Sequence, residues 1–155
     1  MIILRKDFPS GVKMVAKNGE EVSLESVGLS KFAQWLGKLI PKIGRGQNKF
    51  ISFDIKDGGG KNIGYLQLSQ DPVAKVLILD WIEVDNKYRN NGVARAVIQK
   101  VIEYAKSRGF KAIQCEAVGE GPARKLYESL GFKYTGETVE DEGVFGGLAV
   151  MELKL

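Results

Sequence analysis

The chain has 155 residues, of which 44% are hydrophobic and 27% are charged, as in an ordinary globular protein that can bury a core without disulfides. No apolar run approaches the roughly 20 residues needed to span a membrane, and the N-terminus lacks the charge order of a secretory signal. Histidine is absent and there is one cysteine, which excludes histidine bases, histidine triads, histidine or multi-cysteine metal sites and an internal disulfide.

These features lead to four expectations. We expect a single domain over residues 1–155, a cytoplasmic location, no metal, and proton transfers that use carboxylates, tyrosine, lysine, cysteine or water. The net charge of +4 comes from scattered basic residues. Such a charge suits an anionic ligand, but without a basic run it does not indicate a nucleic-acid partner.

Apolar periodicity and turn residues predict the elements of the first half of the chain. A short strand is expected at 2–5, followed by a loop or hairpin through Gly19. The apolar residues between 30 and 40 recur on one helical face. The runs 49–55 and 62–70 alternate like strands on either side of a glycine-rich turn, which is typical of a hairpin.

The second half alternates strands and helices. The run 73–84 is apolar nearly throughout, which is typical of a central strand covered on both faces. The remaining expected elements are a helix at Val93–Ser107 closed by Gly109, a strand at 111–118, a helix from Pro122 closed by Gly131, a strand at 132–135, an acidic turn at 139–143 and a strand at 148–155.

This order of elements indicates a mixed sheet with helices on both faces, in the α/β to α+β range. Strands 73–84 and 111–118 flank a helix and are expected to be parallel, because such crossovers are right-handed.

The segment YRNNGVA, residues 88–94, opens the helix after the central strand. The first N–H groups of a helix have no intrahelical partners, and the helix dipole adds partial positive charge there, so that a phosphate fits. Gly92 and Ala94 would let phosphate oxygens approach the backbone, and Arg89 would supply a cation. A glycine that only eases a tight turn would explain the same residues.

Two motifs resemble those of the GNAT acyltransferase superfamily. Arg89-x-x-Gly92-x-Ala94 resembles its coenzyme A motif, Arg/Gln-x-x-Gly-x-Gly/Ala. Residues 122–132, PARKLYESLGF, resemble its later motif, Ala-x-x-Leu-Tyr-x-x-x-Gly-Phe. The resemblance covers about residues 76–134. It implies a GNAT-like fold, with a mixed, mostly antiparallel sheet, a parallel pair at the coenzyme cleft and helices on both faces.

The resemblance also implies a reaction, in which acetyl-CoA gives its acetyl group to a primary amine of a small molecule, peptide or protein by direct attack on the thioester. The thioester would lie between strands 73–84 and 111–118. The backbone of Ile82, Glu83 and Val84 would pair with pantetheine. The pyrophosphate would be held beside Arg89 by the amides of Asn90, Asn91, Gly92, Val93, Ala94 and, by extension, Arg95.

Such a transfer needs an acid for the departing thiolate and a base for the amine. Tyr127 matches the family's tyrosine near the coenzyme sulfur, which implies a general acid, although a tyrosine that only packs on the sheet could stand there. Several family members carry a base where this chain has Ile78, which cannot serve. Asp80 lies on the same face by strand alternation, Glu83 would reach that face only through a bulge, and water alone is the third alternative.

Glu120 stands where the family often has an asparagine that touches pantetheine. This departure leaves open a GNAT-fold protein that binds coenzyme A without catalysis. The acceptor would be set by the regions 20–48 and 135–147, which carry no motif. Strand 145–155 could exchange or pair between subunits, so a homodimer is a further hypothesis.

Overall fold

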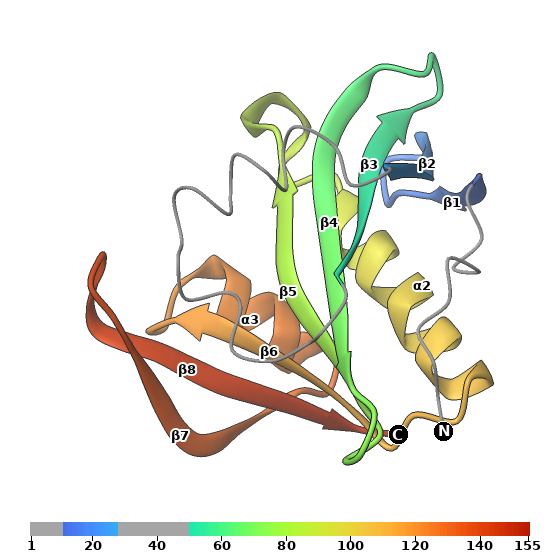
Figure 1. The fold of residues 1–155 in the computed structure, drawn as a ribbon. Helices are drawn as coiled ribbons and strands as arrows, with labels where there is room; N and C mark the ends of the chain where they lie inside the picture. The colour runs from blue at the N-terminus through green and yellow to red at the C-terminus, as the bar shows by residue number, and fades with distance from the viewer. Residues whose placement is uncertain (1–10, 28–49) are drawn as a thin grey trace.

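The computed structural model describes residues 11–27 and 50–155 (Figure 1). The strand expected at 2–5 and the helix expected at 30–40 lie outside these residues. The described elements are β1 Val12–Val15, β2 Glu21–Val27, β3 Ile51–Asp57, β4 Asn62–Asp71, β5 Val76–Val84, the 3₁₀ turn η1 Asn86–Tyr88, α2 Val93–Ser107, β6 Ala112–Val118, α3 Pro122–Ser129, β7 Lys133–Asp141 and β8 Val144–Lys154.

The strands form one eight-stranded sheet in the order β1-β2-β3-β4-β5-β6-β8-β7. All neighbours are antiparallel except β5 and β6, which are parallel and joined by α2. This confirms the expected mixed sheet with a parallel pair. The expected hairpins through Gly19 and through the turn after Asp57 are also present.

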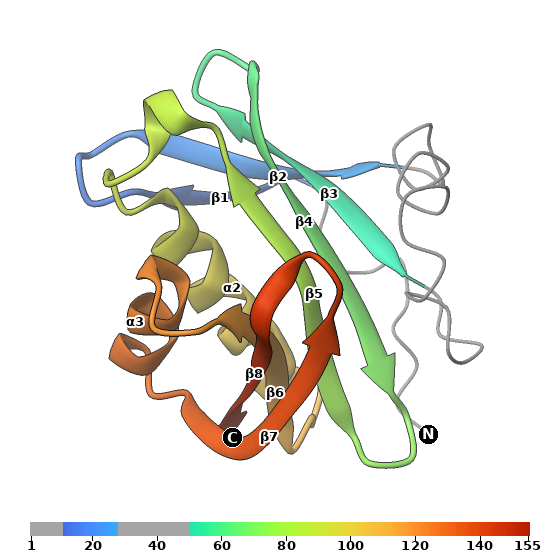
Figure 2. The same cartoon turned by 90° about the vertical axis from the view of Figure 1, so that its left-hand side faces the viewer.

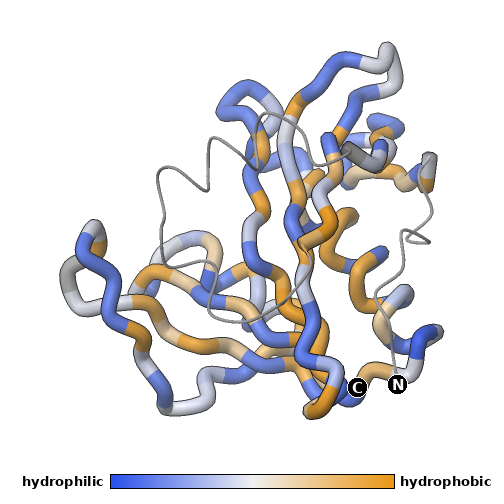
Figure 3. The backbone as a smooth tube through the Cα atoms, in the orientation of Figure 1, coloured by the Kyte–Doolittle hydropathy of each residue, from blue (hydrophilic) through white to orange (hydrophobic). Residues whose placement is uncertain are grey.

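Helices α2 and α3 both pack on one face of the sheet (Figure 2). The expected helices on both faces are therefore not seen among the described residues, and a helix on the other face stays a prediction. The core between them includes Leu77 and Leu79 of β5 and Val97 of α2, of which none is more than 4% exposed. Each such side chain contributes about 1.5–3 kcal/mol through burial. The first four residues of β5 are all hydrophobic, and hydrophilic residues appear only in its second half (Figure 3), where the two faces of the strand become unlike. None of the helices in the described ranges is long and apolar enough to cross a membrane.

Three predicted elements differ from those observed. β5 begins at Val76 rather than at 73, because Asp71 Oδ1 accepts the N–H groups of Val73 and Ala74, at 3.0 Å each, and forms a turn. The acidic segment 139–143 is largely strand, since β7 continues to Asp141 and only the next two residues turn.

The third difference concerns the C-terminal strand. β8 pairs with β6 on one side and with β7 on the other. Direct pairing of residues 145–155 between subunits is therefore wrong as a prediction, because both edges of this strand are already occupied. Exchange of the strand between subunits, and with it a homodimer, stays a prediction.

Candidate active site

The parallel pairing of β5 and β6 is short. It runs from Val76 opposite Ala112 to Leu79 opposite Cys115. Beyond these residues β5 pairs with β4 and β6 pairs with β8, and the two strands separate (Figure 1). We call this separation the β5–β6 fork. It leaves one edge of β5 without a strand partner among the described residues. This is the segment Ile82–Val84, for which the family resemblance implies pairing with pantetheine.

A β-bulge lies at the start of the fork. Trp81 of β5 pairs with Gln67 of β4 and Leu79 pairs with Leu68, so that Asp80 has no partner in the β4 ladder. A bulge of this kind changes which face the following residues occupy. It explains why Leu77 and Leu79 join the core before the bulge, whereas Ile82 and Val84 join it afterwards.

The bulge therefore places Glu83 on the same face as Asp80, which is the face away from α2. Sequence alternation alone had placed Glu83 on the opposite face. Glu83 is exposed, and its Oε2 accepts a hydrogen bond from Trp81 Nε1 at 3.3 Å.

Asp80 is the titratable group most altered by its surroundings on this face. Its Oδ2 atom is shielded from solvent and has no hydrogen-bond partner among the described residues. Burial raises the pKa of Asp80 to about 7, with a further increase from the charge of Glu116 and an opposing effect of the Ser69 hydroxyl. A carboxylate of this kind is half ionised near neutral pH, which suits a general base.

Tyr127 reaches the fork from the other face of the sheet, where α3 packs on β6. It is 5% exposed, and its ring lies 5.4 Å from that of Phe132. Burial, together with the nearby Cys115, raises the pKa of Tyr127, so its phenol stays protonated near neutral pH. Burial also raises the pKa of Cys115 to about 12, which makes its thiol a poor nucleophile.

The loop before α2 presents a row of free backbone donors. Asn90 and Gly92 have positive φ angles of 65° and 80°, and Gly92 caps the helix without a side-chain hydrogen bond. The N–H groups of residues 90–95 find no acceptor among the described residues. The first turn of α2 contains no acidic residue, so the arrangement suits an anion.

Gly92 has a structural reason of its own. A Cβ atom at this position would lie 2.8 Å from Lys17 Cβ and 3.0 Å from Lys17 N, in the β1–β2 hairpin. The positive φ and this close approach both require glycine. The backbone therefore requires glycine at position 92 for the turn itself, as the alternative explanation of this motif predicted. This requirement does not depend on the binding of a ligand.

The side chains of Arg89, in this loop, and Arg95, in the first turn of α2, are engaged in structural contacts. Arg89 Nε donates to the carbonyl of Val84 at 2.8 Å. Arg95 Nη2 donates to Ser129 Oγ at 2.7 Å and links α2 to α3. The sequence analysis expected Arg89 to supply a positive charge and Arg95 to supply its backbone amide. It did not predict the hydrogen bonds of the Arg89 side chain to Val84 or of the Arg95 side chain to Ser129.

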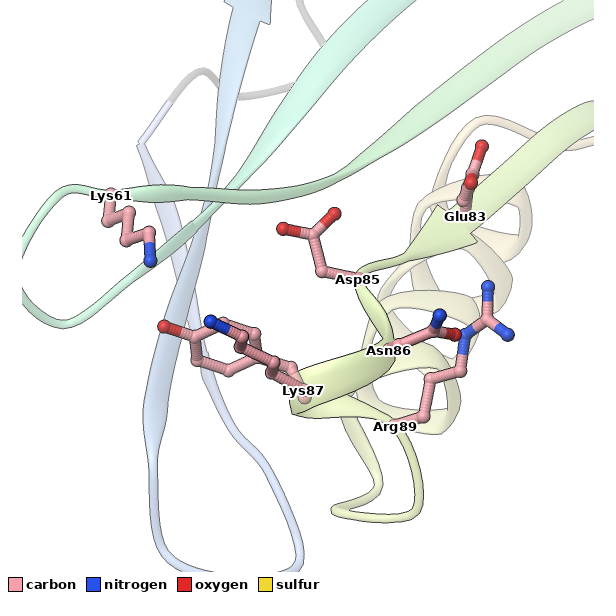
Figure 4. Close-up of a pocket in the computed structure, with 7 residues that line it drawn as sticks. Lys61, Glu83, Asp85, Asn86, Lys87 and Arg89 are labelled. Carbon is pink, nitrogen blue, oxygen red and sulfur yellow. The ribbon is translucent and has the colours of Figure 1, made fainter.

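A pocket of about 360 Å³ lies at the end of β5 (Figure 4). Lys61 approaches from the turn before β4, with its Nζ 5.8 Å from the centre of the Tyr88 ring. The other described lining residues are Glu83, Asp85, Asn86, Lys87 and Arg89. None of these residues comes from β6 or α3, but Glu83 belongs to the segment of β5 that borders the fork, and Arg89 belongs to the loop before α2.

Glu116 is a site residue that the sequence prediction missed. Ile78 pairs with Gln114, so Glu116 of β6 occupies the same face of the sheet as Asp80. A signal was present, because Gln114 and Glu116 alternate with the apolar residues of strand 111–118.

Comparison with known proteins gives a family match. Residues 17–132 match the sequence model described as "Acetyltransferase (GNAT) family". Human N-acetyltransferase 8B is 35% identical over 65 residues, which cover 41% of this chain and 29% of that protein. N-acetylaspartate synthetase of Xenopus tropicalis is 36% identical over 78 residues, covering 50% of this chain and 29% of that protein. The chain thus spans less than a third of the length of these two relatives.

Solved structures share the fold. Nourseothricin acetyltransferase matches with a TM-score of 0.60 and 24% identity over 68% of this chain and 65% of that one. The spermidine/spermine N-acetyltransferase SpeG from Vibrio cholerae matches with a TM-score of 0.65 and 19% identity, over 90% of this chain and 95% of that one. At these identities the similarity shows the fold alone.

Proposed function

Because the chain belongs to the acetyltransferase (GNAT) family, we propose that it transfers an acetyl group from acetyl-CoA to a primary amine of a small molecule, peptide or protein. The observation that carries this proposal is the row of unpaired N–H groups at residues 90–95, directly after the strand that borders the β5–β6 fork. An anion held there would belong to a molecule that can extend along the free edge of β5.

The coenzyme is proposed to bind along this path. Its pyrophosphate accepts hydrogen bonds from the loop amides, and its pantetheine pairs with the backbone of Ile82, Glu83 and Val84 on the open edge of β5. A ligand that adds to an unpaired strand edge gains main-chain hydrogen bonds in this way. The thioester then reaches the fork at Asp80.

The base and the acid of the reaction are proposed to act from opposite faces of the sheet. Asp80 removes a proton from the ammonium group, and the freed amine attacks the thioester carbonyl. The C–S bond then breaks, and Tyr127 gives its phenolic proton to the departing thiolate. The second proton, which the attached nitrogen loses as the amide forms, passes through water to the Tyr127 phenolate and restores the phenol, while Asp80 releases its own proton to solvent. The raised pKa values of both groups favour these roles, because Asp80 can accept a proton near neutral pH while Tyr127 still carries one.

Release of free thiol from acetyl-CoA tests the proposal. The protein is incubated with acetyl-CoA and a panel of primary amines, and thiol release and the mass of the acetylated amine are followed together. We expect stoichiometric thiol and product with at least one amine. Saturable acetyl-CoA binding without turnover on any amine would contradict catalysis and favour a coenzyme-binding protein.

A further inference from the structure

Helix α3, which carries Tyr127, is eight residues long and has no side-chain hydrogen bond at its N-cap. A helix of this length is not stable by itself, so contacts with the rest of the protein must hold it. Arg124 secures the first half, since its Nη1 donates to the carbonyl of Gly119 at 3.3 Å and its guanidinium lies 5.0 Å from the centre of the Tyr134 ring. Tyr127 belongs to the last turn, and helix ends fray most readily. Its position at the fork therefore depends on the contacts of that turn.

Apolar packing and local backbone hydrogen bonds act on the last turn of α3. The ring of Tyr127 packs beside Phe132, and the N–H groups of Leu130 and Phe132 both donate to the Tyr127 carbonyl at 3.0 Å. These hydrogen bonds join residues of one short segment, and the burial of apolar groups has no preferred direction. Such contacts hold the turn together and on the sheet, but they do not tie it to the loop before α2.

Ser129 supplies a directional connection to α2. Its Oγ donates to the carbonyl of Leu126, the residue before Tyr127, at 2.7 Å. The same Oγ accepts a hydrogen bond from Arg95 Nη2 at 2.7 Å, and a charged donor makes this a stronger bond than a neutral one. Arg95 lies in the first turn of α2, and its own N–H is the last in the row of unpaired donors. We call the hydrogen bond between the two side chains the Arg95–Ser129 link.

We propose that Arg95 and Ser129 are positioning residues, which hold Tyr127 at a fixed place relative to the bound coenzyme. This inference rests on the proposed acetyl transfer. The loop amides hold the pyrophosphate, whereas the phenol must come within hydrogen-bond reach of the sulfur at the other end of the coenzyme. The Arg95–Ser129 link joins the two helices on which these groups depend. Neither side chain touches the reacting atoms, so both act through Tyr127.

The variant Ser129→Ala removes the link and keeps the phenol. We expect the single-turnover rate of thiol release to fall about 3- to 10-fold while the Kd of acetyl-CoA stays within about twofold, because one hydrogen bond is lost outside the coenzyme path. Ser129→Thr keeps the hydroxyl and should retain the wild-type rate within about twofold. The matched control is Ser107→Ala, because Ser107 Oγ donates to the Tyr104 carbonyl at 2.8 Å at the end of α2. It should change the rate by less than about twofold. A wild-type rate in Ser129→Ala would overturn the inference.

A double-mutant cycle with Tyr127→Phe separates positioning from general damage to the helix. Without the phenol there is no proton donor to place, so Ser129→Ala should change the rate of thiol release by less than about twofold in that background. A loss by the same factor in both backgrounds would show that the link acts on the fold and not through Tyr127, which would also overturn the inference.

Hydrogen exchange tests the link if the proposed function fails, that is, if acetyl-CoA binds but no amine releases thiol. The N–H groups of Leu130 and Phe132, which donate to the Tyr127 carbonyl, are followed in the protein with coenzyme A. Ser129→Ala should speed their exchange about threefold or more, Arg95→Met should have the same effect, and the double variant should add nothing further. The control variant on α2 should leave both rates unchanged. Exchange rates that Ser129→Ala does not alter would overturn the positioning role.

Discussion

Asp80 and Glu116 lie on either side of the point where β5 and β6 separate, one on each strand and both on the face away from α2, and the charge of Glu116 raises the pKa of Asp80, after the larger effect of burial. The relationship arises from two backbone features, the short parallel pairing that ends at Leu79 and Cys115 and the bulge at Asp80. It gives the face opposite Tyr127 a titratable group suited to accept a proton near neutral pH.

Replacing Asp80 by asparagine should lower kcat/KM while preserving the strand and coenzyme affinity. General bases contribute typically about 10²–10⁴-fold. The loss should shrink as pH rises toward the pKa of an alkyl amine, about 10.4, where free amine is abundant. The wild-type profile should show an acidic limb near pH 7, set by the raised pKa of Asp80, and Asp80→Asn should lack it.

The matched control for this experiment is Glu83→Gln, on the same strand and face. If Glu83→Gln removes the acidic limb and Asp80→Asn does not, Glu83 is the base. A loss that is the same at every pH for Asp80→Asn would mean that Asp80 does not act as a base.

The same substitution should stabilise the fold above neutral pH. The folded-state pKa of Asp80 is about 7 and the ordinary value is 3.8. Below pH 3.8 the group is neutral in both states. Between these values only the unfolded state loses the proton, so the wild-type free energy of unfolding falls as pH rises and then levels off above pH 7.

Asp80→Asn should therefore exceed the wild type in free energy of unfolding by at most about 4 kcal/mol above pH 7, since one pKa unit corresponds to about 1.4 kcal/mol. The two proteins should differ by a constant amount below pH 4. Urea unfolding at pH 4 and pH 8 measures this. A variant that is less stable at pH 8 than at pH 4, relative to the wild type, would contradict the burial of the Asp80 carboxylate.

Tyr127→Phe should lower kcat by about tenfold or more, as expected for loss of a general acid. The ring remains packed beside Phe132, so the coenzyme Kd should be unchanged and the free energy of unfolding should change by less than about 1 kcal/mol. Pre-steady-state thiol release on an accepted amine gives the measurement. A loss below about threefold would assign Tyr127 to packing alone.

Ala94→Glu should abolish coenzyme binding without unfolding α2. Glutamate is favourable in the first turn of a helix, but its carboxylate would take the place proposed for the pyrophosphate. Ala94→Gln has the same size without the charge and should bind at least tenfold more tightly than Ala94→Glu. Calorimetric titration with acetyl-CoA measures the coenzyme affinity of the two variants, and circular dichroism checks that α2 is still folded. Equal affinities in the two variants would place the phosphates elsewhere.

Gly92→Ala should destabilise the protein by about 1–3 kcal/mol, because the residue has a positive φ and its Cβ would meet the backbone of Lys17. Thermal unfolding measures this, and Asn90→Gly, which keeps a residue suited to positive φ, should be neutral within about 0.5 kcal/mol. An unchanged melting temperature for Gly92→Ala would show that the hairpin moves aside freely.

The sequence by itself determined the elements whose information is local. Helix α2 begins and ends at the predicted residues Val93 and Ser107, and Gly109 and Gly131 close the two helices with positive φ angles. Helix periodicity and a glycine at a helix end depend on neighbouring residues, so they predicted the two helices. The crossover rule depends only on the order of elements along the chain, so it predicted the parallel pair. The two motifs fixed the family in the same way.

Only the tertiary structure decided which side chains meet. The bulge at Asp80, the alignment of Glu116 with it, the approach of Lys17 to Gly92 and the placement of β8 between two partners all depend on strand register. Register is set by pairing between segments far apart in the chain, and a shift of one residue turns each side chain to the other face. For this reason the sequence could name Asp80 and Glu83 as candidates but not the face that they share.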